Sequence, residues 1–248
     1  LNGKLIIQPI EHLDLYVANC GSYQEKGYNY IISKAIDKAG KSKEGIPNIE
    51  NMDSFGYTIL QKPLQALNMI YPNKSLNDDG SHSDLKLLGS DGLKRTMKFT
   101  EISYPPVKKD FEYKNSDFGD FFAPDKIGLY SAKIKNITDN IINSEGIILV
   151  YSQFIDGGVI PIALALESLG FTRFGSKSSN LFKSAPHKPI DYKTFLTEDK
   201  MENPKEFKAA KYTMITGDKA LSSDKVNDLK NLTDENNKNG EKIKVVII

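Results

Sequence analysis

The sequence has a single cysteine, Cys20, and no apolar run near the roughly 18 residues that a membrane-spanning helix needs. One cysteine excludes an intramolecular disulfide and is typical of proteins from a reducing compartment. Lysine and arginine number 33 against 32 acidic residues, so the net charge is only +1. No global basic field attracts nucleic acid, and any such contact must be local. We therefore expect an intracellular protein without a membrane segment.

Several motifs that would define an enzyme are also missing. The nearest match to a phosphate loop is residues 170–178, but Ser176 separates its second glycine from the lysine, and the segment follows a helix instead of opening one. Residues 75–80 lack the first Asp and the last Glu of a calcium loop. There is no Gly-x-Ser-x-Gly elbow, and the histidines are isolated: His12, His82 and His187. We predict no catalytic residue and no metal site, and the chain alone should not hydrolyse ATP.

The most informative stretch is residues 146–170. Its apolar, β-branched start, 146–154, predicts a strand buried on both faces, as in a parallel sheet. A polar, glycine-containing turn follows, and Pro161 suits the first turn of a helix that ends at Gly170. A strand, a polar turn and a helix in this order place functional side chains at the carboxyl end of a sheet strand.

The remaining pattern predicts an α/β fold with a parallel sheet. Further strands are expected at 212–215 and 243–248, and a helix capped by residues 222–224 lies between them. Residues 100–124 are expected to be extended, and residues 176–211 to form an irregular insertion. Apolar periodicity predicts four other helices, at 24–36, 57–70 (with Pro63 inside), 92–97 and 126–142.

Two strand-exit turns are the candidate binding residues. Each combines a hydroxyl or amide side chain with glycine, so that backbone N–H groups could meet a phosphate. Their residues are Ser152, Gln153, Gly157 and Gly158 in the first, and Thr216, Gly217 and Lys219 in the second. The structural alternative is that these residues only form turns and cap helices. Asp156 and Asp218 would repel a phosphate if they faced it, so we expect them to cap their own helices.

An aromatic set offers a second possible site. It could stack on bases, although burial in the core is the stronger expectation, because aromatic side chains are regularly internal. Its members are Phe111, Tyr113, Phe118, Phe121 and Phe122. The pairs Lys94-Arg95 and Lys108-Lys109 are too small to count as basic patches.

With these residues in view, the chain resembles the C-terminal RecA-like lobe of superfamily II helicases. The similarity is greatest to the Swi/Snf-like helicases of large nucleocytoplasmic DNA viruses. Tyr151-Ser152-Gln153-Phe154 resembles motif IV of that lobe, and residues 212–219 resemble the following strand with its Gly-Asp turn. Residues 24–31, 60–72 and 92–99 resemble the helical opening of the lobe, and 245–248 the strand that leads into motif V. Within this resemblance, only residues 151–171 and 212–218 are specific to the helicase lobe.

The resemblance implies a division of the chain into a helical and irregular part, 1–124, and a RecA-like part, 125–248, with the insertion 176–211. It implies a fragment of an ATP-dependent helicase or translocase. This lobe would grip a DNA or RNA backbone through Ser152, Gln153, Thr216 and Gly217, and close on an N-terminal RecA-like lobe. ATP and Mg²⁺ would be held mainly by residues outside this chain. In a virus, the location would be the virion or the host cytoplasm, and a role in transcription would follow from the family alone.

Two other classes remain open from the residues themselves. One is an α/β module of the methyltransferase or nucleotide-sugar type, with a small ligand over residues 156–158. The other is a catalytically silent lobe that only scaffolds protein contacts. The helicase interpretation depends on one geometric expectation, which is that the segments ending near Phe154 and Ile215 are adjacent parallel strands with their tips on a common rim.

Overall fold

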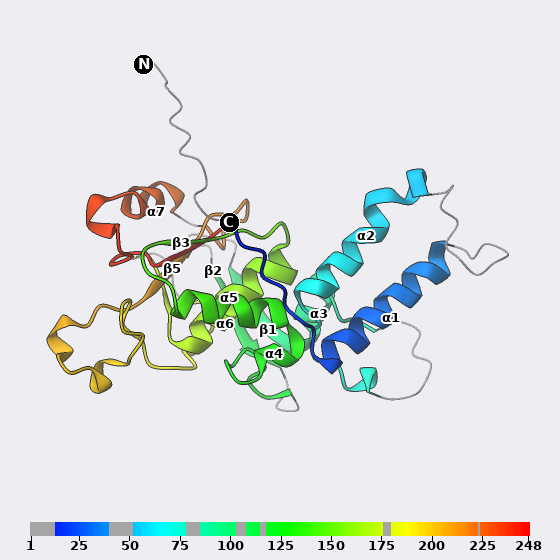
Figure 1. Ribbon diagram of the computed structural model, residues 1–248, viewed down its shortest axis with the longest axis horizontal. Coiled ribbons are helices and arrows are strands. Elements are labelled where there is room, and N and C mark those ends of the chain that lie inside the picture. Colours follow the sequence, from blue (N-terminus) through cyan, green and yellow to red (C-terminus); the bar gives the residue numbers. More distant parts are fainter. Residues whose placement is uncertain are drawn as a thin grey trace, which may run out of the picture.

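The computed structural model describes residues 13–39, 52–77, 85–102, 108–114, 118–175, 180–222 and 224–248. Its centre is a parallel sheet of four strands: β3 (Ile148–Val150), β4 (Thr172–Arg173), β5 (Lys211–Met214) and β6 (Val245–Ile247). The predicted α/β class and the parallel sheet are confirmed. Figure 1 shows the sheet with helices on both sides.

The strand order is β3-β6-β5-β4, which corrects one expectation. β3 and β5 are parallel, and their tips lie at the same end of the sheet, but they are not neighbours because β6 lies between them. The N–H of Ser152 donates to the carbonyl of Ile248 at 2.8 Å, and the N–H of Ile215 donates to that of Ile247 at 2.9 Å. Both strands therefore continue to pair with β6 up to the common rim.

β3 lies at the edge of the sheet, so the prediction that its segment is buried on both faces is wrong. Val150 is buried and Ile148 half-buried, but Leu149 is 62% exposed and Tyr151 75% exposed. A continuous apolar run is typical of a central parallel strand, and here it occupies an edge. The sequence signal was therefore correct for strand formation and wrong for position.

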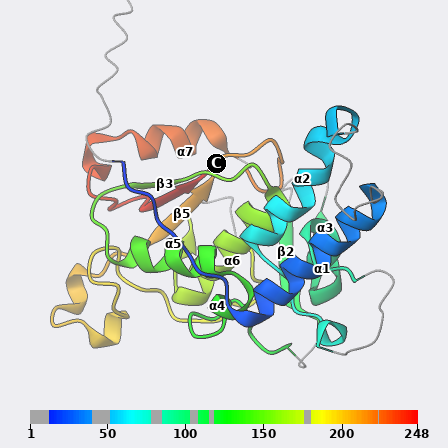
Figure 2. The same cartoon turned by 45° about the vertical axis from the view of Figure 1, so that its right-hand side comes forward.

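Among the described residues, three helices cover the sheet. α5 (Ala132–Ile142) and α6 (Ile160–Leu169) lie on one side, and α7 (Lys225–Leu232) lies on the other (Figures 1 and 2). α6 is buried from Ile160 to Ser168, since it is apolar from Ile160 to Leu166, and the carboxylate of Glu167 is buried with it. Pro161 is in its first turn, and Gly170 ends it with φ of 104°, a left-handed conformation that favours glycine, as predicted. α7 begins after Asp224, which is its N-cap residue.

The predicted helix over 126–142 is broken in two. α4 (Ile127–Tyr130) ends at Ser131, whose backbone is extended and whose hydroxyl accepts the N–H of Ile134 at 2.9 Å to cap α5. The hydroxyl of Ser131 also donates to the carbonyl of Asn68, at the end of α2 (Met52–Asn68). Pro63 lies inside α2, as expected. Ser131, between α4 and α5, therefore connects these two helices to the end of α2.

Gln24, in α1 (Ser22–Ala39), is fully buried and connects three elements. Its amide nitrogen donates to the carbonyls of Ala66 and Leu67 at 3.1 and 3.3 Å, and its oxygen accepts the N–H of Ala132 at 3.0 Å. The short helix expected at 92–97 is α3 (Gly89–Thr96). Residues 100–124 were expected only to be extended, but β1 (Met97–Ile102) and β2 (Lys108–Tyr113) form an antiparallel hairpin.

Replacing Gln24 with alanine is expected to lower the free energy of unfolding by about 2 kcal/mol, because two carbonyls and one N–H lose their buried partner. Urea unfolding followed by circular dichroism measures this. Gln61→Ala, at an exposed position of α2, is the matched control and should have an effect below about 0.5 kcal/mol. If Gln24→Ala and Gln61→Ala lowered the free energy of unfolding equally, the buried hydrogen bonds of Gln24 would not be the cause.

The aromatic set belongs to the core, as expected. Phe111, Phe121 and Phe122 are at most 1% exposed, and Tyr113 and Phe118 pack against the same cluster. The rings of Phe121 and Phe122 lie 4.5 Å apart, and that of Tyr113 lies 5.1 Å from Phe121. These rings pack against one another in the protein interior, so they form no exposed surface for bases.

The described part of the insertion, 180–211, is irregular, as predicted. It contains isolated bridges and two short 3₁₀ helices, Glu198–Lys200 and Pro204–Glu206. Asp191 organises it by accepting the N–H groups of Lys193, Thr194 and Lys208. Burial acts to raise the pKa of Asp191, but these hydrogen bonds outweigh it and hold the pKa below its ordinary value. The insertion is therefore ordered around one carboxylate.

Candidate functional site

A groove with a volume of about 250 Å³ lies at the carboxyl end of β3. It contains four of the predicted residues together: Ser152, Gln153, Gly157 and Gly158. Side chains that the sequence did not indicate line it as well, from α2 and from α5: Leu64, Leu67, Asn68, Lys133, Ile134 and Ile137. The groove is therefore mixed in character, with a polar rim on an apolar wall.

The first exit turn is held by the hydroxyl of Ser152. It accepts the N–H of Phe154 at 3.3 Å and donates to the carbonyl of the same residue at 3.2 Å. The chain then enters a short π-helix, Ile155–Val159, which leads directly into α6. A Cβ built on Gly158 would lie 2.0 Å from the Ser152 oxygen, so this glycine is required by the close approach of the turn.

Asp156 does not cap this helix, which corrects the expectation. The N-cap residue is Phe154, and Asp156 lies in the first turn, where a carboxylate is favourable to the helix dipole. The backbone carbonyl of Asp156 accepts the hydroxyl of Tyr71 at 2.6 Å. Tyr71 is fully buried, and this burial raises its pKa well above the ordinary value. Tyr71 thus fixes the turn from a position 85 residues earlier, and no sequence signal marked it.

The second exit turn has the same local hydrogen bonds. The hydroxyl of Thr216 accepts the N–H of Asp218 at 3.2 Å and donates to its carbonyl at 3.3 Å. Asp218 accepts the N–H of Ala220 at 2.8 Å and pairs with Lys109 of β2 at 3.4 Å. Asp218 therefore stabilises its own turn instead of α7. Gly217 and Lys219 are exposed, and a Cβ on Gly217 would meet nothing within 4 Å.

The two turns share a rim but not a groove. Thr216, Gly217 and Lys219 do not line the groove beside Ser152, and β6 separates the two strand tips. Two strand spacings place them about 10 Å apart. Ser222, expected to cap α7, instead donates to the carbonyl of Met214 at 2.5 Å and accepts the N–H of Thr216 at 3.1 Å. Ser222 therefore stabilises the start of the second turn by hydrogen bonds to Met214 and Thr216.

The charges around the rim are of both signs. Lys133 donates to Asn68 at 2.7 Å beside the groove, and desolvation lowers its pKa. Lys219 is exposed at the second turn, while Lys109 is already paired with Asp218 and Glu101. The available positive charge at the rim is thus small and local, in agreement with the net charge of the chain.

The residues present do not fit a triphosphate or its metal ion. Residues 170–175 run from the C-cap of α6 into β4, whereas a phosphate loop joins a strand to a helix N-terminus. In the described segments, no three Asp, Glu, His or Cys side chains come close enough to hold a metal ion.

The fold and the rim define this chain as an α/β protein with a four-stranded parallel sheet and polar strand-exit turns. No known protein-family model matches it, and no curated protein sequence is significantly similar to it. Within the described segments, every helix is too short or too polar to span a bilayer.

Proposed function

We propose that this chain binds the sugar-phosphate backbone of DNA or RNA along the carboxyl rim of its sheet. It would act as the RecA-like C-terminal lobe of an ATP-dependent helicase or translocase. ATP and Mg²⁺ would be held mainly by an N-terminal RecA-like lobe, and this chain would contribute the second side of the cleft. The expected location is intracellular, in the virion or the host cytoplasm.

The observation that carries the proposal is the repeated turn at the ends of β3 and β5. Ser152 and Thr216 make the same pair of hydrogen bonds two residues ahead, at parallel strand tips on one rim. A separation of about 10 Å lets each turn contact a different phosphate of one strand. Exposed Lys219 and Lys133 supply a positive charge near each turn.

The alternative of a small ligand over residues 156–158 is less well supported. The Cα of Gly158 faces the side chain of Ser152, and the carbonyl of Asp156 is occupied by Tyr71. A ligand that uses glycine for close backbone approach would need this space. A scaffold lobe without nucleic-acid contacts remains the outcome if the binding experiment fails.

Filter retention of labelled single- and double-stranded oligonucleotides tests the proposal. The double variant Ser152→Ala/Thr216→Ala should weaken binding, and Lys219→Ala should reduce the slope of log K against log salt by about 0.7 to 0.9, the value for one phosphate contact. Lys230→Ala, an exposed lysine of α7, is the matched control. Binding that is absent in the unchanged chain, or equal in all four proteins, would refute the proposal.

A further inference from the structure

The outer edge of β3 carries unpaired backbone groups. The N–H groups of Ile148 and Ser152 and the carbonyl of Val150 all bond to β6. Because hydrogen bonds alternate in direction along a strand, Leu149 and Tyr151 direct their N–H and carbonyl groups to the opposite side. In the described part of the chain, β3 pairs only with β6. Such an edge accepts a further strand unless something covers it.

The side chain of Leu149 is uncovered on the face of the sheet that carries α7. Leu149 is in register with Val246 of β6 and, through it, with Thr213 of β5. α7 covers the inner strands on this face, since Asp228 accepts the hydroxyl of Thr213 at 2.6 Å, and Val246 is buried. Leu149 is 62% exposed. The cover of the sheet therefore stops one strand short of its edge.

Residues 13–20, which we call the N-terminal strap, lie beside this edge. The strap is extended, and no backbone hydrogen bond joins it to another described residue. Figures 1 and 2 show it crossing α5 on its way to the start of α1. Tyr16, Ala18 and Cys20 of the strap line a cavity of about 630 Å³ together with Leu149. The strap and the edge of β3 are thus two walls of one cavity.

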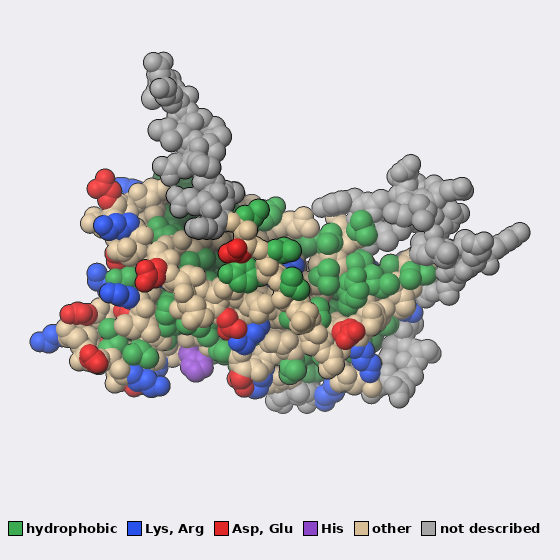
Figure 3. Space-filling model, viewed as in Figure 1, with side chains coloured by type: hydrophobic (Ala, Val, Ile, Leu, Met, Phe, Trp, Pro, Cys, Tyr) green, Lys and Arg blue, Asp and Glu red, His purple; other side chains and the backbone are tan. Residues whose placement is uncertain are grey.

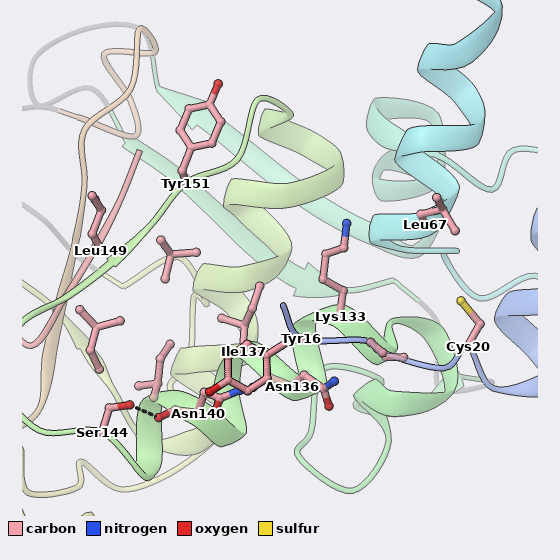
Figure 4. A pocket seen from close by; sticks show the side chains of 15 residues that line it. Tyr16, Cys20, Leu67, Lys133, Asn136, Ile137, Asn140, Ser144, Leu149 and Tyr151 are labelled. Carbon is pink, nitrogen blue, oxygen red and sulfur yellow. Dashed lines mark hydrogen bonds between the residues drawn. The ribbon is translucent and has the colours of Figure 1, made fainter. Parts of the chain in front are cut away.

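The strap runs in the same direction as β3. It ends at α1, which is bonded to the first residue of α5, Ala132. Tyr16, nearer the start of the strap, lies farther along α5, beside Ile137 (Figure 4). β3 points to the same end of α5, since Tyr151, just after it, shares the smaller groove with Lys133. The strap therefore has the orientation of a further parallel strand.

The side chains of the strap alternate between two faces. The three even-numbered ones line the cavity, and Figure 3 shows apolar side chains in the middle of the face across which the strap runs. Because successive side chains of a strand point to opposite faces, pairing with β3 would place the odd-numbered ones beside Leu149. These three are apolar, and each is at least 75% exposed: Leu13, Leu15 and Val17. One arrangement therefore covers both faces of the edge.

We propose that the N-terminal strap closes onto the outer edge of β3 and forms a fifth, parallel strand of the sheet. Its backbone bonds to the outward groups of Leu149 and Tyr151, and Leu15 and Val17 cover the side chain of Leu149. Natural edge strands are protected by charge, proline or a covering element, and residues 147–151 contain neither charge nor proline. The strap is that covering element, and this inference does not depend on nucleic-acid binding.

The strap is the occupant of the edge because it is already tethered there. It continues directly into α1, so its effective concentration at the edge is on the order of millimolar. Five extended residues span about 16 Å, which exceeds the length of the three residues of β3. A free peptide or a second copy of the chain would have to displace side chains that line the cavity now.

Amide hydrogen exchange, followed residue by residue by NMR in the full chain, tests the closure. The double variant Leu15→Asp/Val17→Asp places two charges beside Leu149, so the strap should open. The N–H groups of Leu149 and Tyr151 should then exchange about tenfold faster than in the unchanged protein. The N–H of Ser152, which bonds to β6, is the internal reference and should keep its rate.

The matched control is Val226→Asp on α7, which changes an apolar side chain that is 81% exposed and outside the cavity. It should leave the exchange of Leu149 and Tyr151 unchanged. The proposal is overturned if these two amides exchange equally fast in the unchanged protein and in the double variant. It is also overturned if sedimentation velocity shows that their protection requires a dimer, since a second copy would then cover the edge.

Discussion

Replacing Glu167 with glutamine is expected to lower the free energy of unfolding by about 2 kcal/mol at pH 5, and to leave it unchanged or slightly raise it at pH 8. Glu167 lies in α6 and is 1% exposed. One of its oxygens accepts the N–H of Leu181 at 2.6 Å and the hydroxyl of Tyr212 at 2.5 Å, and the other accepts the N–H of Phe182 at 2.7 Å. It thus fastens the start of the insertion to the sheet.

Glutamine cannot reproduce this arrangement. In either orientation, its amide N–H₂ group faces a backbone N–H, so a buried donor is left without an acceptor at a cost of about 1–3 kcal/mol. A protonated glutamate avoids this conflict, because its own O–H can donate to the hydroxyl oxygen of Tyr212. The stability lost in the Glu167→Gln variant is therefore largest at low pH, where the wild-type glutamate is protonated.

The pH dependence follows from the pKa of Glu167. Burial raises it from 4.5 to about 7, against the lowering effect of the hydrogen bonds from Phe182, Tyr212 and Leu181. A carboxyl with a raised folded pKa binds its proton more tightly in the folded state. Its contribution is therefore present below pH 4.5 and is lost as the pH rises from about 4.5 to about 7. The difference between the ordinary pKa of 4.5 and the folded-state pKa of about 7 corresponds to about 3 kcal/mol of folding free energy.

The wild-type protein should lose this stability between pH 5 and 8. The glutamine variant has no titratable group at position 167 and should not show this loss. Urea unfolding of both proteins at the two pH values measures the difference between their free energies of unfolding, which should be smaller at pH 8. Glu198→Gln, at an exposed position of the insertion, is the control and should show no such pattern. A gap that is constant or wider at pH 8 would mean that Glu167 is ionised throughout.

The second large effect is expected at Gly158. Gly158→Ala should lower the free energy of unfolding by about 3 kcal/mol, at the upper end of the range for overpacking. The new Cβ would lie 2.0 Å from the oxygen and 2.9 Å from the Cβ of Ser152, and Ser152 is held by its bonds to Phe154. Thermal and urea unfolding measure the loss.

Two further variants separate this clash from a general effect of alanine. Gly157→Ala should be neutral or slightly stabilising, because its nearest neighbours would be Gln65 and Gly89 at 3.8 Å or more, and alanine favours helix. Ser152→Gly in the Gly158→Ala protein should recover most of the loss, since it removes both clashing atoms. A Gly157→Ala protein as unstable as Gly158→Ala would show that the assigned contact is not the cause.

The elements around the rim were predictable because their signals are local. Pro161 and Gly170 bound α6, apolar runs with β-branched residues mark β3 and β6, and the glycine-containing turns lie at the strand ends. The hydroxyl turns at Ser152 and Thr216 also follow from short-range chemistry, since each hydrogen bond spans two residues.

The failures concern long-range packing. Residues 146–154 have the composition of a central strand, yet β3 is an edge, because β6 returns from about 100 residues later to fill only its inner side. Asp156 and Ser222 were expected to cap helices. The carbonyl of Asp156 instead accepts the hydroxyl of Tyr71, which follows α2, and the hydroxyl of Ser222 donates to the carbonyl of Met214, the last residue of β5. The groove residues Lys133 and Leu67 gave no signal, since helices α5 and α2 meet only in the folded chain.

The sequence by itself determined the α/β class, the strand–turn–helix unit at 146–170 and the polar character of both exit turns. These depend on propensity and on hydrogen bonds within a few residues. Only the tertiary structure decided the strand order, the open edge at Leu149 and the burial of Glu167 beneath the insertion. The reason is physical: strand order and burial depend on which distant segments compete for the same apolar surface, and composition within a segment does not encode that competition.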